Sequence, residues 1–252
     1  YKRQQAGMVI AKRFPRDEIG ATARILRECE RRSLAEVAQY SYPRGSTTVE
    51  GPSIKLAEVM ARNWGNMIYG LTELSQSEGV SEVEAFAWDL ETNTKVSRRF
   101  QVRHIREKQS GDIDLTSMRD IYELIANMGQ RRVRACILEV IPGDIQEKAV
   151  NQCNAALKKG AEGIPLKDRI IKMVSKFDEL GVPQKAIEKR LQHPVNVTTE
   201  VELVALQKIH NSIRDKVTDR KAWFDLEGSS SGSGEDKEGE KIRKDFLAWM
   251  KK

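Results

Sequence analysis

The sequence has few cysteines and no long apolar run. Its three cysteines, Cys29, Cys136 and Cys153, lie far apart and form no C-x-x-C pair. This pattern argues against a disulfide scaffold and against a zinc site, and it suits a reducing compartment. No apolar stretch approaches about 18 residues, the length typical of a membrane-spanning helix. We therefore expect a cytoplasmic protein that does not enter a membrane.

Sequence motifs of several enzyme classes are also missing. Neither G-x-x-x-x-G-K-[ST] nor G-x-G-x-x-G occurs, so the common loops that bind the phosphates of ATP or of a dinucleotide are excluded. H-E-x-x-H is absent, and the three histidines are isolated. Acidic residues that a metal-dependent nuclease would use lie on or beside one predicted strand, without a second set at suitable spacing: Glu82, Glu84, Asp89 and Glu91. We expect no catalytic site, no metal and no cofactor.

Positive charge is what the sequence has in excess. The 252 residues include 43 Lys and Arg against 37 Asp and Glu, a formal charge of +6. Hydrophobic residues make up 39%, enough for a core, and the length suits one large domain or two smaller ones. A basic protein more often binds nucleic acid or another anionic surface than an acidic partner. These properties favour a binding protein.

The first third of the chain reads as two helical regions separated by a loop. Residues 1–16 are basic without periodicity, which predicts a flexible arm. Residues 17–40 are helical, with a second short helix from Ser33. Residues 41–52 contain two prolines and two glycines and are predicted to be a loop. Residues 53–64 form the next helix.

Three strands and two helices follow. Alternating apolar residues predict strands over 67–76, 80–90 and 95–105, with a short hairpin loop at Asn93. A polar loop over 107–116 then leads into a long helix over 117–141, whose buried stripe begins at Met118, and a further helix covers 144–159. The fold class is therefore α+β, a three-stranded antiparallel β-meander packed with a long basic helix (a β-β-β-α core).

The last part of the chain is predicted to be helical, without strands, and to end in a linker and a tail. Residues 165–223 contain three short amphipathic helices, with Thr199 at the start of the third, and residues 161–164 suit a hinge. The GSSSGSG sequence over 228–234 is typical of a flexible linker, and a charged tail follows it. The predicted domains are an α+β domain, a helical C-terminal module, and a linker with a tail, over 1–160, 161–227 and 228–252.

Several cations fall at positions that would face a phosphate backbone. Arg131 and Arg134 are three residues apart and project on neighbouring sides of one face of the long helix, with Arg132 at its edge, and Arg131 lies roughly opposite Val133. Other cations follow one face of the third strand and the loop after it: Lys95, Arg99, Arg103, Arg106 and Lys108. The alternative is that these are ordinary solvated faces.

The order of elements and several segments resemble the phage single-strand annealing proteins of the Red-beta and RecT type. The local likeness lies in QRRVRACILEVIP over 130–142. Further similar stretches cover residues 41–66, 83–102 and 201–224. The resemblance spans most of residues 17–227.

The resemblance implies ATP-independent annealing of complementary single strands by a homo-oligomeric ring or helical filament, in the bacterial host cytosol if a phage encodes the chain. Such a protein is not an enzyme. Its partners would be single-stranded DNA and the annealed duplex, and the C-terminal module would recruit an exonuclease or a host single-strand binding protein. Phosphate contacts would come from the cations named above, then from Arg44 and Lys55. Candidates for base stacking are Tyr42, Trp64 and Trp88.

Two other functions remain open from the sequence. A metal-dependent nuclease would use the carboxylates of the second strand. A scaffold protein would direct the basic faces at acidic proteins and would not bind DNA.

Overall fold

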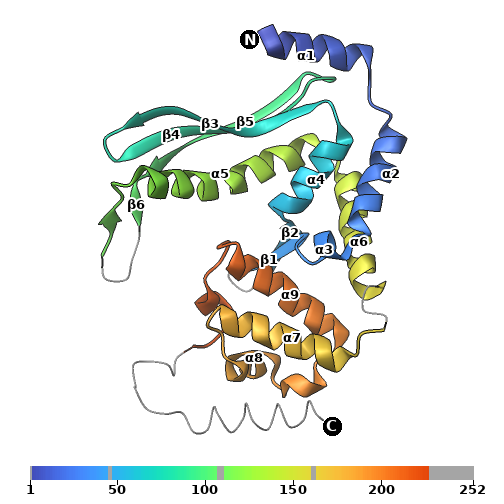
Figure 1. Ribbon diagram of the computed structural model, residues 1–252, viewed down its shortest axis with the longest axis vertical. Coiled ribbons are helices and arrows are strands. Elements are labelled where there is room, and N and C mark those ends of the chain that lie inside the picture. Colours follow the sequence, from blue (N-terminus) through green and yellow to red (C-terminus); the bar gives the residue numbers. More distant parts are fainter. Residues whose placement is uncertain (1, 45–46, 107–110, 160–162, 227–252) are drawn as a thin grey trace.

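The computed structural model describes residues 2–44, 47–106, 111–159 and 163–226 (Figure 1). Its largest sheet is antiparallel and three-stranded, with β3 (Met67–Ser77), β4 (Val80–Asp89) and β5 (Thr94–Arg103) in the order β3-β4-β5. The turns between these strands contain Gly79 and Asn93, both with positive φ, a conformation that glycine and asparagine tolerate. The predicted α+β class and the predicted strands are confirmed.

Helix α5 (Met118–Val140) packs along one face of this sheet (Figure 1). Its buried side chains recur at helical spacing and include Ile121, Ile125, Val133 and Ile137. Met118 was predicted to share that stripe, but it is 66% exposed. The reason is that the first turn of α5 lies near the end of β3, where every residue from 72 onward is exposed.

Close contact between α5 and β3 depends on Gly129. A Cβ atom at this position would lie 2.4 Å from one methyl group of Leu71 and 2.6 Å from the other. Both distances are far shorter than a van der Waals contact, so a side chain here would push the helix and the strand apart.

Three helices and a short helical turn complete the main core. They are α2 (Glu18–Cys29), α3 (Arg32–Ala35), α4 (Ile54–Trp64) and α6 (Gly143–Lys159). One hydrophobic cluster joins Ile25 of α2, Met60 of α4, Ile137 of α5 and Cys153 of α6. The helices predicted from periodicity are therefore present, and they share one core with the inner face of the sheet.

The N-terminal segment forms a helix, α1 (Lys2–Arg13), where we predicted a flexible arm. Ala11 is buried, and Gly7 lies against Leu90, just after β4. Arg16, which follows the helix, forms an ion pair of 2.7 Å with Asp89, and both side chains are almost fully buried. The prediction was wrong because these contacts with β4 come from distant residues and leave no local pattern.

The predicted loop over 41–52 is also wrong, because residues 41–44 and 47–52 form paired strands. Strands β1 (Gln39–Arg44) and β2 (Thr47–Pro52) pair in antiparallel fashion. In a two-stranded hairpin each strand has one unpaired edge, so Pro43 and Pro52 are tolerated. The region after β5 forms a second small pair, β6 (Ile105–Arg106) with β7 (Ile113–Asp114). Lys108 lies outside the described residues.

The C-terminal helices are α7 (Leu166–Glu179), α8 (Gln184–Leu191) and α9 (Glu200–Arg214), with short 3-10 turns η1 (Val195–Val197) and η2 (Arg220–Ala222). They surround a hydrophobic cluster of their own, with Phe177 at its centre. Thr199 and Glu202 form a capping box at the start of α9, which confirms the predicted cap. The GSSSGSG segment and the tail lie outside the described residues. No helix in the described part of the chain is both long and apolar enough to cross a membrane.

We predict that Gly129→Ala destabilises the protein by about 1–3 kcal/mol, because the new methyl group overlaps Leu71. Without that overlap, alanine in a helix would stabilise by about 1 kcal/mol. Urea unfolding measures the difference. Gly143→Ala is the control, since no atom lies within 4 Å of its added Cβ. In a Leu71→Ala background the cost of Gly129→Ala should shrink; an unchanged cost would contradict this account.

Candidate nucleic-acid interface

A groove of about 460 Å³ lies where α5, the start of α4, β1 and the turn after α9 meet. We call it the basic groove. Its cations outnumber its carboxylates five to one: Lys55, Arg131, Arg134, Arg214 and Lys216 against Asp215. Tyr40, Ser53 and Gln130 are among its other lining residues. An anionic chain is the ligand that such a lining favours.

Local structure explains why these cations converge. Arg131 and Arg134 lie on the side of α5 away from buried Val133. Ser53 caps α4 by accepting a hydrogen bond from the Leu56 backbone N–H, so α4 begins at the groove with Lys55 in its first turn. The partial positive charge of a helix N-terminus therefore adds to that of the side chains.

Arg134 differs from the other cations of the basic groove in its burial and in its neighbours. Its guanidinium lies over the Tyr40 ring at 4.1 Å from the centroid. Burial lowers the pKa of Arg134, and the neighbouring charge of Arg131 lowers it further. Among the residues that the structure describes, no carboxylate forms an ion pair with it. A half-buried cation without a counter-ion is stabilised by a ligand that brings negative charge.

The other groove cations have only partial compensation. Arg131 donates a hydrogen bond to the backbone carbonyl of Lys216, which connects α5 to the turn after α9. Lys55 lies 3.8 Å from Glu58, at the long end of an ion pair, and is well exposed. Arg214 pairs with its neighbour Asp215 at 2.8 Å. The basic groove therefore keeps a positive surplus.

Arg132 points elsewhere, although we grouped it with Arg131 and Arg134. Its guanidinium lies 3.9 Å from the centroid of the Phe100 ring and donates a hydrogen bond to the Met128 carbonyl. Burial lowers its pKa. Phe100 is on the sheet face that α5 covers, so Arg132 packs at the helix–sheet boundary and does not line the basic groove.

The strand cations occupy the opposite face of the sheet. Lys95 and Arg99 alternate with Val96 and lie on the face that α5 does not cover. Both are ion-paired with Glu84 on β4, at 3.8 and 3.5 Å. The structure therefore separates these cations from the basic groove and offsets part of their charge.

The remaining predicted cations lie at the ends of strands. Arg103 is exposed at the end of β5, and Arg106 on β6 lies 3.8 Å from Asp120. Arg44 is exposed at the end of β1, at the tip of the hairpin. None of the three lines the basic groove.

The three aromatic candidates differ in accessibility. Trp64 is only 2% exposed and lies under the Arg16 guanidinium, so no base can stack on it. Trp88 is on the uncovered face of the sheet, where its indole N–H donates to Asn93. Tyr42 packs against the C-terminal cluster and stacks on Tyr40 at a centroid distance of 5.9 Å.

Sequence reasoning missed three residues of the basic groove: Tyr40, Arg214 and Lys216. Tyr40 alternates with Tyr42, a period of two that would have been informative had the segment been recognised as a strand. Lys216 has positive φ in the turn that ends α9. Its position beside α5 depends on a contact between distant elements, which no local pattern signals.

Acidic residues give little support to a nuclease. Within the described ranges, no group of three or more His, Cys, Asp or Glu side chains is arranged to hold a metal ion. Glu84, one of the carboxylates considered for that role, is paired with Lys95 and Arg99. A metal ion would have to displace both cations.

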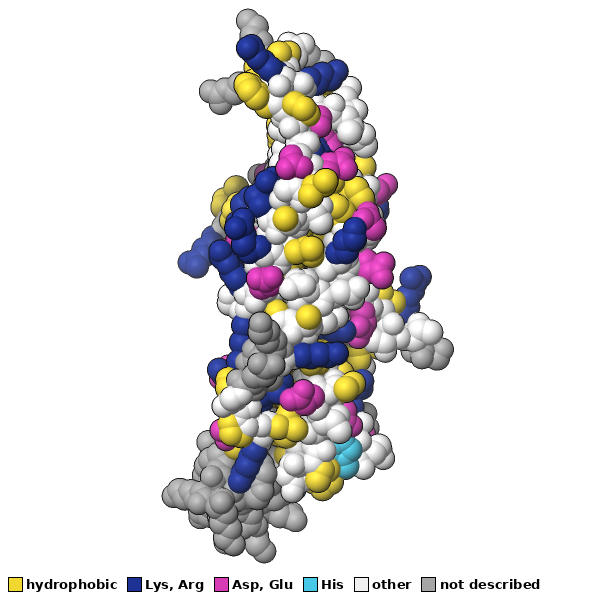
Figure 2. Space-filling model, turned by 90° about the vertical axis from the view of Figure 1, so that its right-hand side faces the viewer, with side chains coloured by type: hydrophobic (Ala, Val, Ile, Leu, Met, Phe, Trp, Pro, Cys, Tyr) yellow, Lys and Arg dark blue, Asp and Glu magenta, His cyan; other side chains and the backbone are white. Residues whose placement is uncertain are grey.

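Positive charge is not confined to the basic groove. Figure 2 views the molecule from the side on which α2 and α6 lie, and Lys and Arg side chains gather along one edge of this face. Acidic side chains are interspersed, mostly along the other edge. What distinguishes the basic groove is the concave arrangement of its cations around an aromatic ring.

Comparison with known proteins does not identify a family. No family model matches the chain, and no curated protein or solved structure matches it. The geometry of the basic groove is therefore the basis for a functional proposal.

One wall of the basic groove depends on how α9 is attached to the hairpin. Asn211 is 2% exposed, and its amide donates to the Glu36 carbonyl at 2.7 Å and to the Gln39 carbonyl at 3.1 Å. The neighbouring Ser212 hydroxyl accepts a hydrogen bond of 2.8 Å from the Ser41 backbone N–H. These contacts bring Arg214 and Lys216 to the basic groove.

We predict that Asn211→Ala lowers the free energy of unfolding by about 1–3 kcal/mol, because a buried and a partly buried carbonyl group lose their donor. Urea unfolding measures this loss. Asn196→Ala, at an exposed position in η1, is the matched control and should change stability by less than about 0.5 kcal/mol. Equal effects of the two substitutions would contradict the anchoring role of Asn211.

Proposed function

We propose that this protein binds single-stranded DNA in the basic groove and promotes pairing of complementary strands without ATP. The observation that carries the proposal is Arg134, a half-buried cation that stacks on Tyr40 and has no carboxylate partner among the described residues. Cations that follow a phosphate backbone release counterions on binding and give affinity without sequence preference.

The arrangement suits a single strand better than a duplex. Arg131, Arg134 and Lys216 would contact phosphates, and the tyrosine pair at Tyr40 and Tyr42 offers an aromatic surface for a base. A groove that also receives the start of a helix adds backbone N–H groups as phosphate donors. Pairing of complementary strands is itself favourable, so a protein that reduces strand repulsion requires no nucleotide hydrolysis.

The resemblance to phage annealing proteins supports the same function. In this proposal β3, β4, β5 and α5 are the β-β-β-α core of that family, and α5 contributes Arg131 and Arg134 to the DNA site. The residues of the uncovered sheet face, Lys95 and Arg99, are secondary contacts at most, because Glu84 already pairs with both.

Self-association is part of the proposal. Apolar side chains of α1 and the segment after it are exposed: Val9 is 67%, Ile10 58% and Phe14 67% accessible. Exposed apolar groups of this size often contact another chain. A head-to-tail contact between copies would generate the expected ring or helical filament. The C-terminal module would then be the part that contacts an exonuclease or a single-strand binding protein.

The test is a pair of arginine substitutions in the basic groove. We predict that Arg131→Ala/Arg134→Ala weakens binding of an oligonucleotide roughly tenfold or more, because two charged hydrogen-bond donors are lost. The slope of log K against log salt should fall by about 1.4, since each contact to a single strand contributes about 0.7. Fluorescence anisotropy at several salt concentrations measures both, and pairing of two labelled complementary strands without ATP should slow in parallel.

Arg27→Ala/Arg62→Ala is the matched control, because it removes the same charge from two exposed positions outside the basic groove. It should leave the affinity within about twofold of the unsubstituted protein. Equal weakening by both variants would mean that binding follows net charge alone. Shortening of strands in the presence of magnesium, without accelerated pairing, would favour a nuclease instead.

A further inference from the structure

A second concave site lies on the opposite side of the Asn211 anchor, between α3 and α6 of the main core and α7 and α9 of the C-terminal module. Its volume is about 60 Å³. Its cations are Arg32, Arg169, Lys172 and Lys176, and its single carboxylate is Glu36. Gln207 of α9 and Arg214 of the basic groove are seven residues apart, about 10 Å along the helix, so the two sites are distinct.

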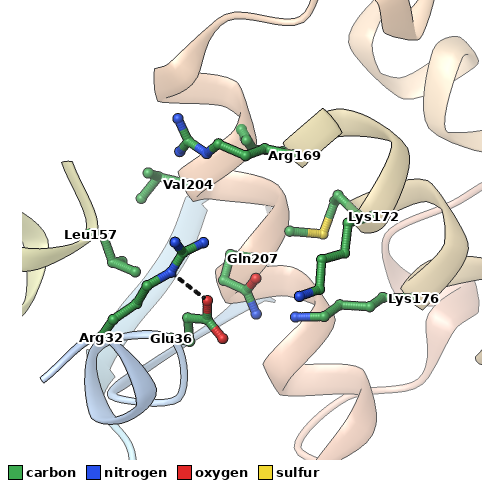
Figure 3. Close-up of a pocket in the computed structure, with 10 residues that line it drawn as sticks. Arg32, Glu36, Leu157, Arg169, Lys172, Lys176, Val204 and Gln207 are labelled. Atoms are coloured by element: carbon green, nitrogen blue, oxygen red, sulfur yellow. Dashed lines mark hydrogen bonds and ion pairs between the residues drawn. The ribbon is translucent and has the colours of Figure 1, made fainter. Parts of the chain in front are cut away.

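The charges of this pocket do not cancel. Arg32 pairs with Glu36 at 3.0 Å, and Arg169 pairs with Glu200 at 2.9 Å. Lys172 and Lys176 form no ion pair or side-chain hydrogen bond with any residue that the structure describes. Figure 3 shows both lysines pointing into the pocket, towards the amide of Gln207. Two positive charges therefore remain without counter-ions.

The two lysines repel each other weakly when no ligand is bound, since Lys172 is exposed and Lys176 is partly buried. They are four residues apart on α7, so like charges are neighbours on one helix face. Helix α7 places them in the same pocket as Arg32 of α3, which is also positively charged. A bound anion that accepts hydrogen bonds from both would offset this repulsion and would connect the module to the core.

We propose that this pocket binds a phosphate monoester group. Such a group carries a charge of about −1.5 to −2 at pH 7 and three acceptor oxygens, which match the two uncompensated lysines and the Gln207 amide. One water requires about 10–15 Å³, so the pocket has room for a tetrahedral oxyanion. The group belongs either to a small phosphorylated molecule or to the 5′ end of a DNA strand, and the proposal does not depend on binding in the basic groove.

The experiment is calorimetric titration of the full chain with inorganic phosphate, against chloride at equal ionic strength. We expect saturable binding of phosphate and at least about a tenfold weakening in Lys172→Gln/Lys176→Gln, where two charged donors are lost. Lys185→Gln/Lys221→Gln removes the same charge from exposed lysines of the same module and should bind as the unsubstituted chain does. The single variant Lys172→Gln should show an intermediate loss, and circular dichroism confirms that each variant is folded.

Two further binding measurements distinguish the possible sources of the phosphate monoester group. An oligonucleotide with a 5′-phosphate that binds more tightly than the same strand without it, only while Lys172 and Lys176 are present, would identify the strand end. Equal binding of the two strands, with phosphate still bound through the lysines, would identify a small phosphorylated molecule. Absence of phosphate binding, or equal binding by the unsubstituted chain and Lys172→Gln/Lys176→Gln, would overturn the proposal.

Discussion

The attachment of α9 to the β1–β2 hairpin is the contact on which both candidate sites depend. Asn211 donates to the backbone carbonyl groups of Glu36, just after α3, and of Gln39, at the start of β1, so loss of this buried amide would leave both without this donor. On one side of this anchor, the turn after α9 closes the basic groove with Arg214 and Lys216. On the other side, α9 and α7 close the pocket of Lys172 and Lys176. The orientation of a single helix therefore determines the geometry of both.

The two sites share positive charge that lines a concave surface and is only partly offset by carboxylates. On the sheet, Lys95 and Arg99 are paired with Glu84, and Arg98 pairs with Glu139 at 2.7 Å. Such exposed pairs are worth little to stability, but they reduce the local potential. Arg134, by contrast, is half-buried and stacks on an aromatic ring. Net charge does not distinguish the ion-paired cations of the sheet from Arg134. The neighbouring side chains do, because the sheet cations contact carboxylates and Arg134 contacts an aromatic ring.

Local patterns predicted the sheet and the long helix well, because alternation and helical spacing are properties of adjacent residues. Arg131 and Arg134 were placed correctly on one side of α5 for the same reason. The hairpin over 39–52 was missed because proline and glycine usually indicate loops, and α1 was missed because its contact with the segment after β4 is distant in sequence. The convergence of Tyr40, Arg134 and Lys216 is likewise a tertiary event, so the sequence indicated some of the cations and not the groove.

The central claim is that single-stranded DNA lies in the basic groove, and photo-cross-linking tests it most directly. A strand that carries photoreactive bases is bound to the full chain and irradiated, and the modified peptides are mapped by mass spectrometry. Cross-links at Tyr40 and in residues 127–134 and 214–217 are the predicted result. Cross-links confined to the uncovered face of the sheet, around Trp88 and Arg99, would contradict the assignment of the basic groove.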